Sequence, residues 1–196
     1  CALIVMYLFL EERMVQTDYM TGAWTRYSFE FCLASKLKSQ QNTPFGVIYV
    51  DIDNLKAIND RYGHAEGDIA IKAAVLSIRE VLRKGDAVAR LGGDEFAILL
   101  NISSHETLEA IAERIRAAVC RYSDASGKPY RLTLSLGGDI FVESADNTVD
   151  SIVNKADRLM YANKHSSCGH ETADAAGIAM VCDCGAASDA PKPADP

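Results

Sequence analysis

Two neighbouring acids, Asp94 and Glu95, follow a pair of glycines, Gly92 and Gly93, in the middle of the chain. Short apolar runs flank these four residues, which predicts a β-hairpin with its turn at the glycines. Because glycine has no side chain, the backbone of such a turn can lie close to a ligand. Carboxylates at a rigid turn offer the oxygen ligands that a hard divalent cation prefers. The alternative is an ordinary acidic turn, and these residues by themselves do not decide between the two.

A third acid, Asp51, lies about 40 residues earlier. Residues 45–52 are an apolar run that predicts a buried strand, and Asp51 and Asp53 stand at its carboxyl end, where ligand sites form in βα units. A sheet that pairs this strand with the hairpin would bring Asp51, Asp94 and Glu95 together. Three acids and a strand-end carbonyl suit one or two Mg²⁺ ions, and a two-metal site activates an attacking oxygen and stabilises a leaving one. The predicted chemistry is therefore phosphoryl or nucleotidyl transfer.

Basic and amide side chains that could bind a nucleotide lie in the segments that follow. Lys56 and Lys164 could contact phosphates, although each by itself is typical of a solvated helix face. Asn59 and Asp68 could recognise the edge of guanine, since the acid accepts from its N1–H and amino group and the amide can donate. Asp68 also follows Gly67 at the expected start of a helix, so the alternative for it is an N-cap.

Alternating helices and strands must position these residues. A second Gly-Gly-Asp, at 137–139, has no Glu-Phe after it and is interpreted as punctuation at the end of a strand. The pattern predicts an α/β or α+β fold with helices around a central sheet. Strand-like runs cover 45–52, both arms of the hairpin and 130–136, and helical spacing of apolar residues covers 25–39, 54–62, 68–83, 104–122 and 148–164.

Length and composition limit the class of protein. The chain has 196 residues, of which 48% are hydrophobic, enough for one domain with a core plus extensions. Its formal net charge of −7 argues against a partner nucleic acid, but it is compatible with a nucleotide substrate whose phosphates a metal ion neutralises. Cys32 and Cys120 fall within apolar helical patterns, which fits buried thiols in a reducing compartment better than a disulfide framework.

The two ends differ in composition from the middle. Residues 1–10 are almost wholly apolar but too few to span a bilayer, so they fit either the end of a transmembrane or sensory segment or a packing helix that leads into the domain. We expect a linker or signalling helix at 1–17, a folded domain at 18–170 and a disordered tail at 171–196. A small zinc knot is a rival to free thiols in this region, and its ligands would be His165, Cys168, His170, Cys182 and Cys184.

Four motifs follow one another along the chain from Asp18 to Lys164. They are Asp18-x-x-Thr21-Gly22-x-x-x-Arg26, Asp51-x-Asp53-x-x-Lys56-x-x-Asn59-Asp60-x-x-Gly63-His64-x-x-Gly67-Asp68, Arg90-x-Gly92-Gly93-Asp94-Glu95-Phe96 and Ala156-Asp157-x-x-Met160-Tyr161-x-x-Lys164. Any one motif could arise by chance, whereas all of them in sequence are specific. Taken in order and at their spacing, they resemble the GGDEF diguanylate cyclase family.

The resemblance implies a palm-like, mostly antiparallel sheet of about five strands flanked by helices, similar to that of nucleotide cyclases. It implies that two GTP molecules condense to cyclic di-GMP with loss of two pyrophosphates. Each domain would hold one GTP, so two copies must face each other as a homodimer. The domain is expected in the cytoplasm, with an upstream sensor or membrane segment supplying the signal.

The resemblance also implies roles for individual positions. Asp51, the carbonyl of Ile52 and Asp94 would hold Mg²⁺ or Mn²⁺, and Glu95 would hold metal or act as the base for the 3′-hydroxyl. Lys56 would stabilise charge on the phosphates, and Asp68 favours guanine. The implied substrate-binding residues are Asn59, His64, Asp68, Gly92, Gly93 and Lys164.

Arg83 and Asp86 have the spacing of the family's inhibitory site, where cyclic di-GMP binds as product. The alternative is a basic helix end stopped by Gly85. The sequence departs from the family at Cys168, which stands where a phosphate-binding arginine is usual, so one charge-assisted contact worth on the order of 1.5–3 kcal/mol is missing. The alternative to an active cyclase is therefore a domain that binds GTP or cyclic di-GMP and regulates a partner.

Overall fold

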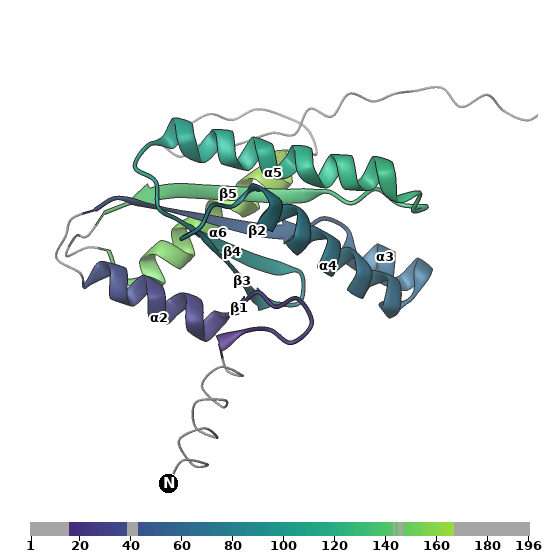
Figure 1. Ribbon diagram of the computed structural model, residues 1–196, viewed down its shortest axis with the longest axis horizontal. Coiled ribbons are helices and arrows are strands. Elements are labelled where there is room, and N and C mark those ends of the chain that lie inside the picture. Colours follow the sequence, from purple (N-terminus) through teal and green to yellow (C-terminus); the bar gives the residue numbers. More distant parts are fainter. Residues whose placement is uncertain (1–15, 39–42, 143, 145–146, 167–196) are drawn as a thin grey trace, which may run out of the picture.

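The computed structural model describes residues 16–38, 43–142, 144 and 147–166 (Figure 1). Helices and strands alternate along these residues, as the apolar spacing predicts. The elements are β1 (Trp24–Thr25), α2 (Arg26–Leu37), β2 (Phe45–Ile52), α3 (Leu55–Tyr62), α4 (His64–Val81), β3 (Ala87–Gly92), β4 (Glu95–Leu100), α5 (His105–Ser126), β5 (Leu134–Phe141) and α6 (Val149–Ser166).

One five-stranded sheet with the order β1-β3-β4-β2-β5 forms the centre of the described part of the chain. Only the short β1 runs parallel to its neighbour, and the β3–β4, β4–β2 and β2–β5 pairs are antiparallel. The expected mostly antiparallel sheet of about five strands, flanked by helices, is therefore confirmed. β2 lies between β4 and β5 and is buried at all eight positions.

Helices cover both faces of the sheet (Figure 1). Ile48, Val50 and Ile52 of β2 belong to one apolar cluster, together with residues of α3, α4 and α5. Val47 and Tyr49 point the other way, into a cluster with residues of α2 and α6. A strand with both faces covered must be apolar at successive positions, which is why β2 has a continuous apolar run rather than an alternating pattern.

Among the helix boundaries, the start of α4 and the end of α5 differ most from the sequence-based expectation. α4 begins at His64 and not at Asp68, so Asp68 lies inside the helix and its interpretation as an N-cap is wrong. The turn before α4 is made by Gly63, whose φ of +89° is accessible to glycine at little cost. α5 continues to Ser126 through residues expected to form a loop, and it ends at Gly127 with φ of +62°.

The second Gly-Gly-Asp lies inside β5, so its interpretation as the end of a strand is also wrong. A Cβ atom at Gly137 would lie 2.1 Å from the backbone nitrogen of Met160 in α6. One at Gly138 would lie 2.5 Å from the carbonyl oxygen of Val47 in β2. The two glycines thus allow a helix and a neighbouring strand to approach β5 at van der Waals distance.

Several expectations concern residues outside the described ranges. They are the apolar segment 1–10, the tail and the proposed zinc ligands Cys168, His170, Cys182 and Cys184, together with the side chain of His165. No helix among the described residues is long and apolar enough to cross a membrane. Cys32 and Cys120 are free thiols, and both are half-buried rather than fully buried.

Candidate functional site

The β-hairpin and β2 bring the predicted acids to one edge of the sheet. In the register between β2 and β4, Asp51 stands opposite Glu95. The amide of Ile52 donates to the carbonyl oxygen of Asp94 over 3.2 Å, which ties the turn to the end of β2. The sheet therefore joins, through its backbone, three acids that are about 40 residues apart in the sequence.

The turn itself uses its two glycines differently. Gly93 adopts a φ of +31°, in the region that favours glycine, whereas Gly92 has no positive φ. Nothing lies within 4 Å of the position that a Cβ atom would occupy at Gly93. The backbone at Gly93 is thus open to a ligand on that side.

Lys164 of α6 lies in this group of acids. Its Nζ atom is 2.5 Å from Oδ1 of Asp51, which is only 8% exposed. Burial raises the pKa of Asp51, the charges of Asp94 and Asp53 raise it further, and Lys164 acts in the opposite direction. Burial by itself would lower the pKa of Lys164, but its hydrogen bond to Asp51 and the nearby acids outweigh this, so its pKa is raised. The site therefore holds more negative charge than this one lysine neutralises.

The donor set fits a hard divalent cation by its chemistry, because it consists of carboxylate oxygens on a rigid strand end whose charges repel one another. The side chains do not yet converge on one point. Oε2 of Glu95 lies 3.9 Å from the guanidinium of Arg26, and Asp51 is paired with Lys164. Within the part of the chain that the structure describes, no three His, Cys, Asp or Glu side chains are grouped closely enough to hold a metal ion.

Arg90, which is paired with Asp18 of the first motif, holds the turn in place. The Nε and Nη2 atoms of Arg90 donate to the carbonyl of Gly93 over 3.1 and 2.8 Å. Nη1 of Arg90 lies 3.4 Å from Asp18, which also accepts from the amide and hydroxyl of Thr21. Burial by itself would raise the pKa of Asp18, but the hydrogen bonds from Thr21 and the charge of Arg90 outweigh it, and the pKa is lowered.

Arg26 supports the same turn from α2, since its Nε donates to the carbonyl of Leu91 over 3.1 Å. Sequence reasoning assigned no role to Arg26 or Arg90. Both are part of the motifs, but their contacts to the turn depend on tertiary structure. The available signal was their spacing, which places an arginine shortly before the Gly-Gly turn and another near the start of α2.

The expected base-recognition residues meet where α3 turns into α4. His64 is the first residue of α4, and Asp68 follows one turn later. A Cβ atom at Gly67 would lie 1.9 Å from Oδ1 of Asn59, so the absence of a side chain at Gly67 lets the Asn59 amide rest on α4. Asn59, His64 and Asp68 thus share one corner. Lys56 is exposed on the first turn of α3.

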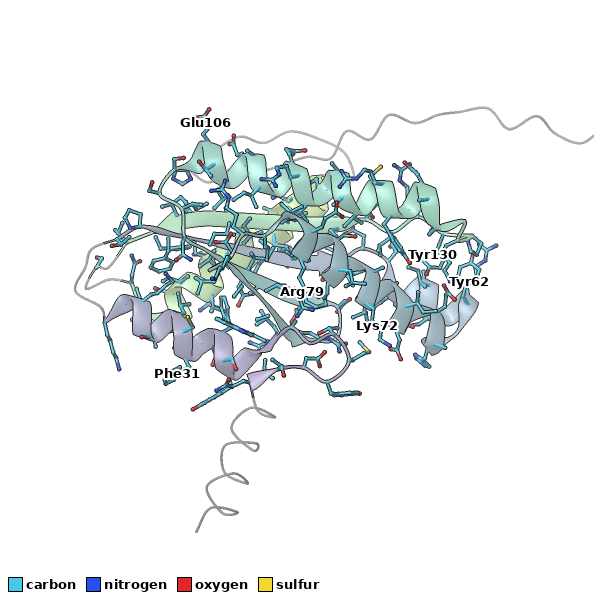
Figure 2. All side chains as sticks on the ribbon, in the orientation of Figure 1. Phe31, Tyr62, Lys72, Arg79, Glu106 and Tyr130 are labelled. Carbon is cyan, nitrogen blue, oxygen red and sulfur yellow. The ribbon has the colours of Figure 1, made fainter. Side chains whose placement is uncertain are left out.

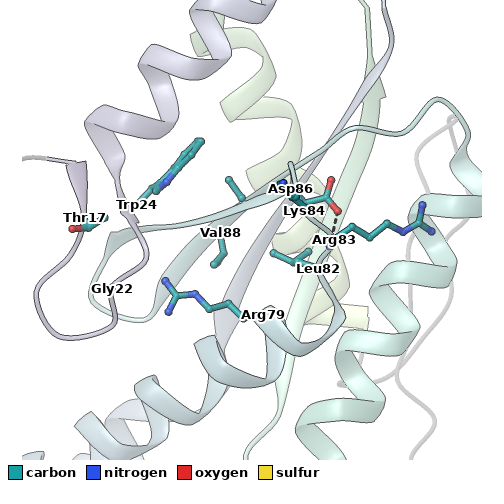
Figure 3. Close-up of a pocket in the computed structure, with 10 residues that line it drawn as sticks. Thr17, Gly22, Trp24, Arg79, Leu82, Arg83, Lys84, Asp86 and Val88 are labelled. Atoms are coloured by element: carbon teal, nitrogen blue, oxygen red, sulfur yellow. Dashed lines mark hydrogen bonds between the residues drawn. The ribbon is translucent and has the colours of Figure 1, made fainter. Parts of the chain in front are cut away.

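Arg83 and Asp86 lie in the loop between α4 and β3, at the opposite end of β3 from the acids. The carboxylate of Asp86 accepts from the backbone amides of Arg83 and Asn101 over 3.1 and 3.0 Å. α4 already ends at Val81, so Gly85 does not stop it, and that part of the alternative interpretation is wrong. An open pocket of about 350 Å³ adjoins the loop (Figure 3), and its lining includes Trp24, Arg79, Arg83, Lys84 and Asp86.

The chain matches a known domain family and several known proteins. The profile described as "Diguanylate cyclase, GGDEF domain" matches residues 15–170. An uncharacterised protein of Bacillus subtilis, YhcK, is 37% identical over an alignment of 157 residues that covers 76% of this chain and 43% of that protein. Diguanylate cyclase A of Treponema denticola is 35% identical over an alignment of 162 residues that covers 78% of this chain and 43% of that protein. The chain thus spans less than half the length of these relatives.

Solved structures show the same fold. The isolated GGDEF domain of TpbB from Pseudomonas aeruginosa superposes with a TM-score of 0.68 at 34% sequence identity, covering 76% of this chain and 89% of the other. The fold expected from the sequence and the fold observed thus agree with those of a characterised group of domains.

Proposed function

Because the chain belongs to the GGDEF domain family of diguanylate cyclases, we propose that it condenses two molecules of GTP into cyclic di-GMP and two pyrophosphates. The observation that carries the proposal is the strand register that sets Asp51 opposite Glu95 and joins Ile52 to Asp94. This register gathers the oxygen donors of a nucleotidyl transfer site at the end of a fully buried strand. The relatives named diguanylate cyclase support the same reaction.

In the proposed reaction, each site activates the GTP molecule that it binds. Glu95 takes the proton of the 3′-hydroxyl, and the freed oxygen attacks the α-phosphorus of the GTP held by a second copy. A bond from oxygen to the α-phosphorus forms, the bond to the bridging oxygen breaks, and pyrophosphate leaves. A second transfer with the two nucleotides exchanged closes the ring, which is why the active unit is a homodimer.

A divalent cation, Mg²⁺ or Mn²⁺, would be held by Asp51, Asp94 and the Ile52 carbonyl, and when bound would neutralise phosphate charge. Lys56 and Lys164 contact the phosphates as they gain charge. Lys164 is already inside the site, where its Nζ atom meets Asp51. Because negative charge on the phosphates grows as the bond breaks, the ammonium groups of the two lysines stabilise the transition state more than the ground state.

The base is selected at the corner between α3 and α4. The carboxylate of Asp68 accepts from N1–H and the 2-amino group of guanine, and the Asn59 amide offers both a donor and an acceptor. His64 lines the same corner. Adenine presents an acceptor at N1, so Asp68 disfavours ATP.

A regulatory domain that binds GTP or cyclic di-GMP without turnover is the second candidate. One observation favours it: Cys168 stands where a phosphate-binding arginine is usual in the family. Arg83 and Asp86, next to the open pocket, are the proposed product site in either case.

The deciding experiment is to incubate the purified protein at high concentration with GTP and Mg²⁺ and to separate the products. We expect cyclic di-GMP and pyrophosphate from the wild type and neither from Glu95→Gln. GTP binding without product, even when two copies are fused, would reject the enzyme and favour the regulatory domain. Failure to bind either nucleotide would reject both candidates.

A further inference from the structure

A cluster of side chains joins the loop before β5 to the corner between α3 and α4. Glu66, in the first turn of α4, accepts hydrogen bonds from the hydroxyl of Tyr130 over 2.9 Å and from Nζ of Lys128 over 2.5 Å. The hydroxyl of Tyr62, the last residue of α3, donates to the carbonyl of Pro129 over 3.1 Å. One loop is thus bonded to both helices that form the corner.

Ring packing strengthens this contact. The rings of Tyr62 and Tyr130 lie 5.5 Å apart, side by side at the α3 end of the molecule (Figure 2). The Glu66 and Lys128 side chains are only 21% and 28% exposed, so their ion pair is better shielded than an ordinary surface pair. We call Tyr62, Glu66, Lys128 and Tyr130 the corner clamp.

The position of the clamp relates it to the nucleotide site. Glu66 lies between His64 and Asp68 in the sequence and next to Gly67, on which the Asn59 amide rests. Further along the same segment, Thr133 accepts from the amide of Asp53, and the hydroxyl of Ser135 donates to the Asp53 carboxylate over 2.6 Å. The segment 128–135 therefore contacts the base-recognition corner at one end and the end of β2 at the other.

We propose that Glu66, held by Lys128 and Tyr130, is a positioning residue that fixes α4 against α3 so that Asn59 and Asp68 are preorganised for guanine. This inference rests on the proposed function. Without the clamp the first turn of α4 loses its side-chain bonds to the 128–130 loop, to which the end of α3 is also bonded, so the corner is held by the packing of α3 on α4 at Gly67 and in the core. A site that is correctly formed only part of the time binds more weakly in proportion to that fraction, so GTP affinity and base discrimination should both fall.

The test compares Glu66→Ala, Tyr130→Phe and the conservative Glu66→Gln. The control is Glu80→Ala, because Glu80 also makes an ion pair from α4, to Arg121 of α5 at 3.1 Å, but with both side chains exposed and far along the helix from the corner. Hydrogen exchange of residues 55–68 is measured without nucleotide. Affinities for 3′-deoxy-GTP and 3′-deoxy-ITP, which lack the attacking hydroxyl and cannot react, are measured by calorimetry.

We expect Glu66→Ala to speed exchange at 55–68, to raise the Kd for 3′-deoxy-GTP at least about threefold and to reduce the preference for it over the inosine analogue. Tyr130→Phe should act in the same direction. Glu66→Gln should lose less affinity than Glu66→Ala, because its amide oxygen can still accept a hydrogen bond from Tyr130. Glu80→Ala should match the wild type. A Glu66→Ala protein with unchanged exchange, or with faster exchange but unchanged affinity and preference, would overturn the clamp. A wild type that does not bind 3′-deoxy-GTP, whatever the exchange shows, would instead overturn the proposed function.

Discussion

Gly67→Ala should change stability and nucleotide binding in opposite directions. Gly67 lies inside α4 without a positive φ, so alanine suits its backbone and should stabilise the helix by up to about 1 kcal/mol. The added Cβ atom, however, would lie 1.9 Å from Oδ1 of Asn59. Because that atom is the end of a flexible side chain, Asn59 can rotate away at little cost to folding.

The cost to nucleotide binding follows from the hydrogen bond to guanine that Asn59 would lose. If its amide makes one net hydrogen bond to guanine, displacement costs about 0.5–1.5 kcal/mol, or roughly a two- to tenfold higher Kd. Urea unfolding measures the first effect, and calorimetry with 3′-deoxy-GTP measures the second. Asn59→Ala should give a similar loss of affinity.

The double variant Gly67→Ala/Asn59→Ala decides whether the two residues act through one contact. If alanine at Gly67 acts only by displacing Asn59, adding it to Asn59→Ala should raise the Kd no further. Wild-type affinity in Gly67→Ala would refute the assignment of Asn59 to base recognition. A loss of more than about 1 kcal/mol of stability would refute the argument that only the side chain must move.

Three further results are expected. Gly137→Ala should destabilise the protein by about 3 kcal/mol or more in urea unfolding, because the new Cβ atom would lie 2.1 Å from the backbone nitrogen of Met160. A loss of stability below about 1 kcal/mol would instead show that α6 can shift. Because the pKa of Asp18 is lowered in the folded protein, its charge contributes stability that is complete above the unfolded pKa of about 3.9 and is lost as the pH falls through the folded pKa. Asp18→Asn should therefore flatten the acid side of a curve of unfolding free energy against pH. An unchanged acid side of that curve would contradict this. Arg83→Ala should raise the concentration of cyclic di-GMP needed for half-inhibition at least about fivefold, since a charged hydrogen bond is lost, and unchanged inhibition would remove Arg83 from the product site.

Much of the fold could be predicted from local patterns. The apolar run at 45–52 predicts β2 with the observed bounds, because a strand with both faces covered needs apolar side chains at successive positions. The hairpin was predictable from Gly92 and Gly93 between two apolar arms. The motif order identified the family and hence the acids that meet at the sheet edge.

Two of the errors have a common physical origin in glycine. Gly67 was taken to precede a helix and Gly137 to end a strand, since glycine lacks a side chain to stabilise either element. In the structure each lies inside its element, because another part of the chain occupies the space that a side chain would need: the Asn59 amide at Gly67 and the backbone of Met160 at Gly137. A local pattern does not contain the position of that second segment.

The sequence by itself determined the family, the sheet and the types of residue available for chemistry, since these follow from periodicity and motif spacing. Only the tertiary structure decided which of these residues contact one another. Lys164 meets Asp51 across 113 positions, and Tyr130 meets Glu66 across 64. Such contacts depend on the packing of whole helices against the sheet, and a change in one helix boundary, as at His64, alters which side chains face each other.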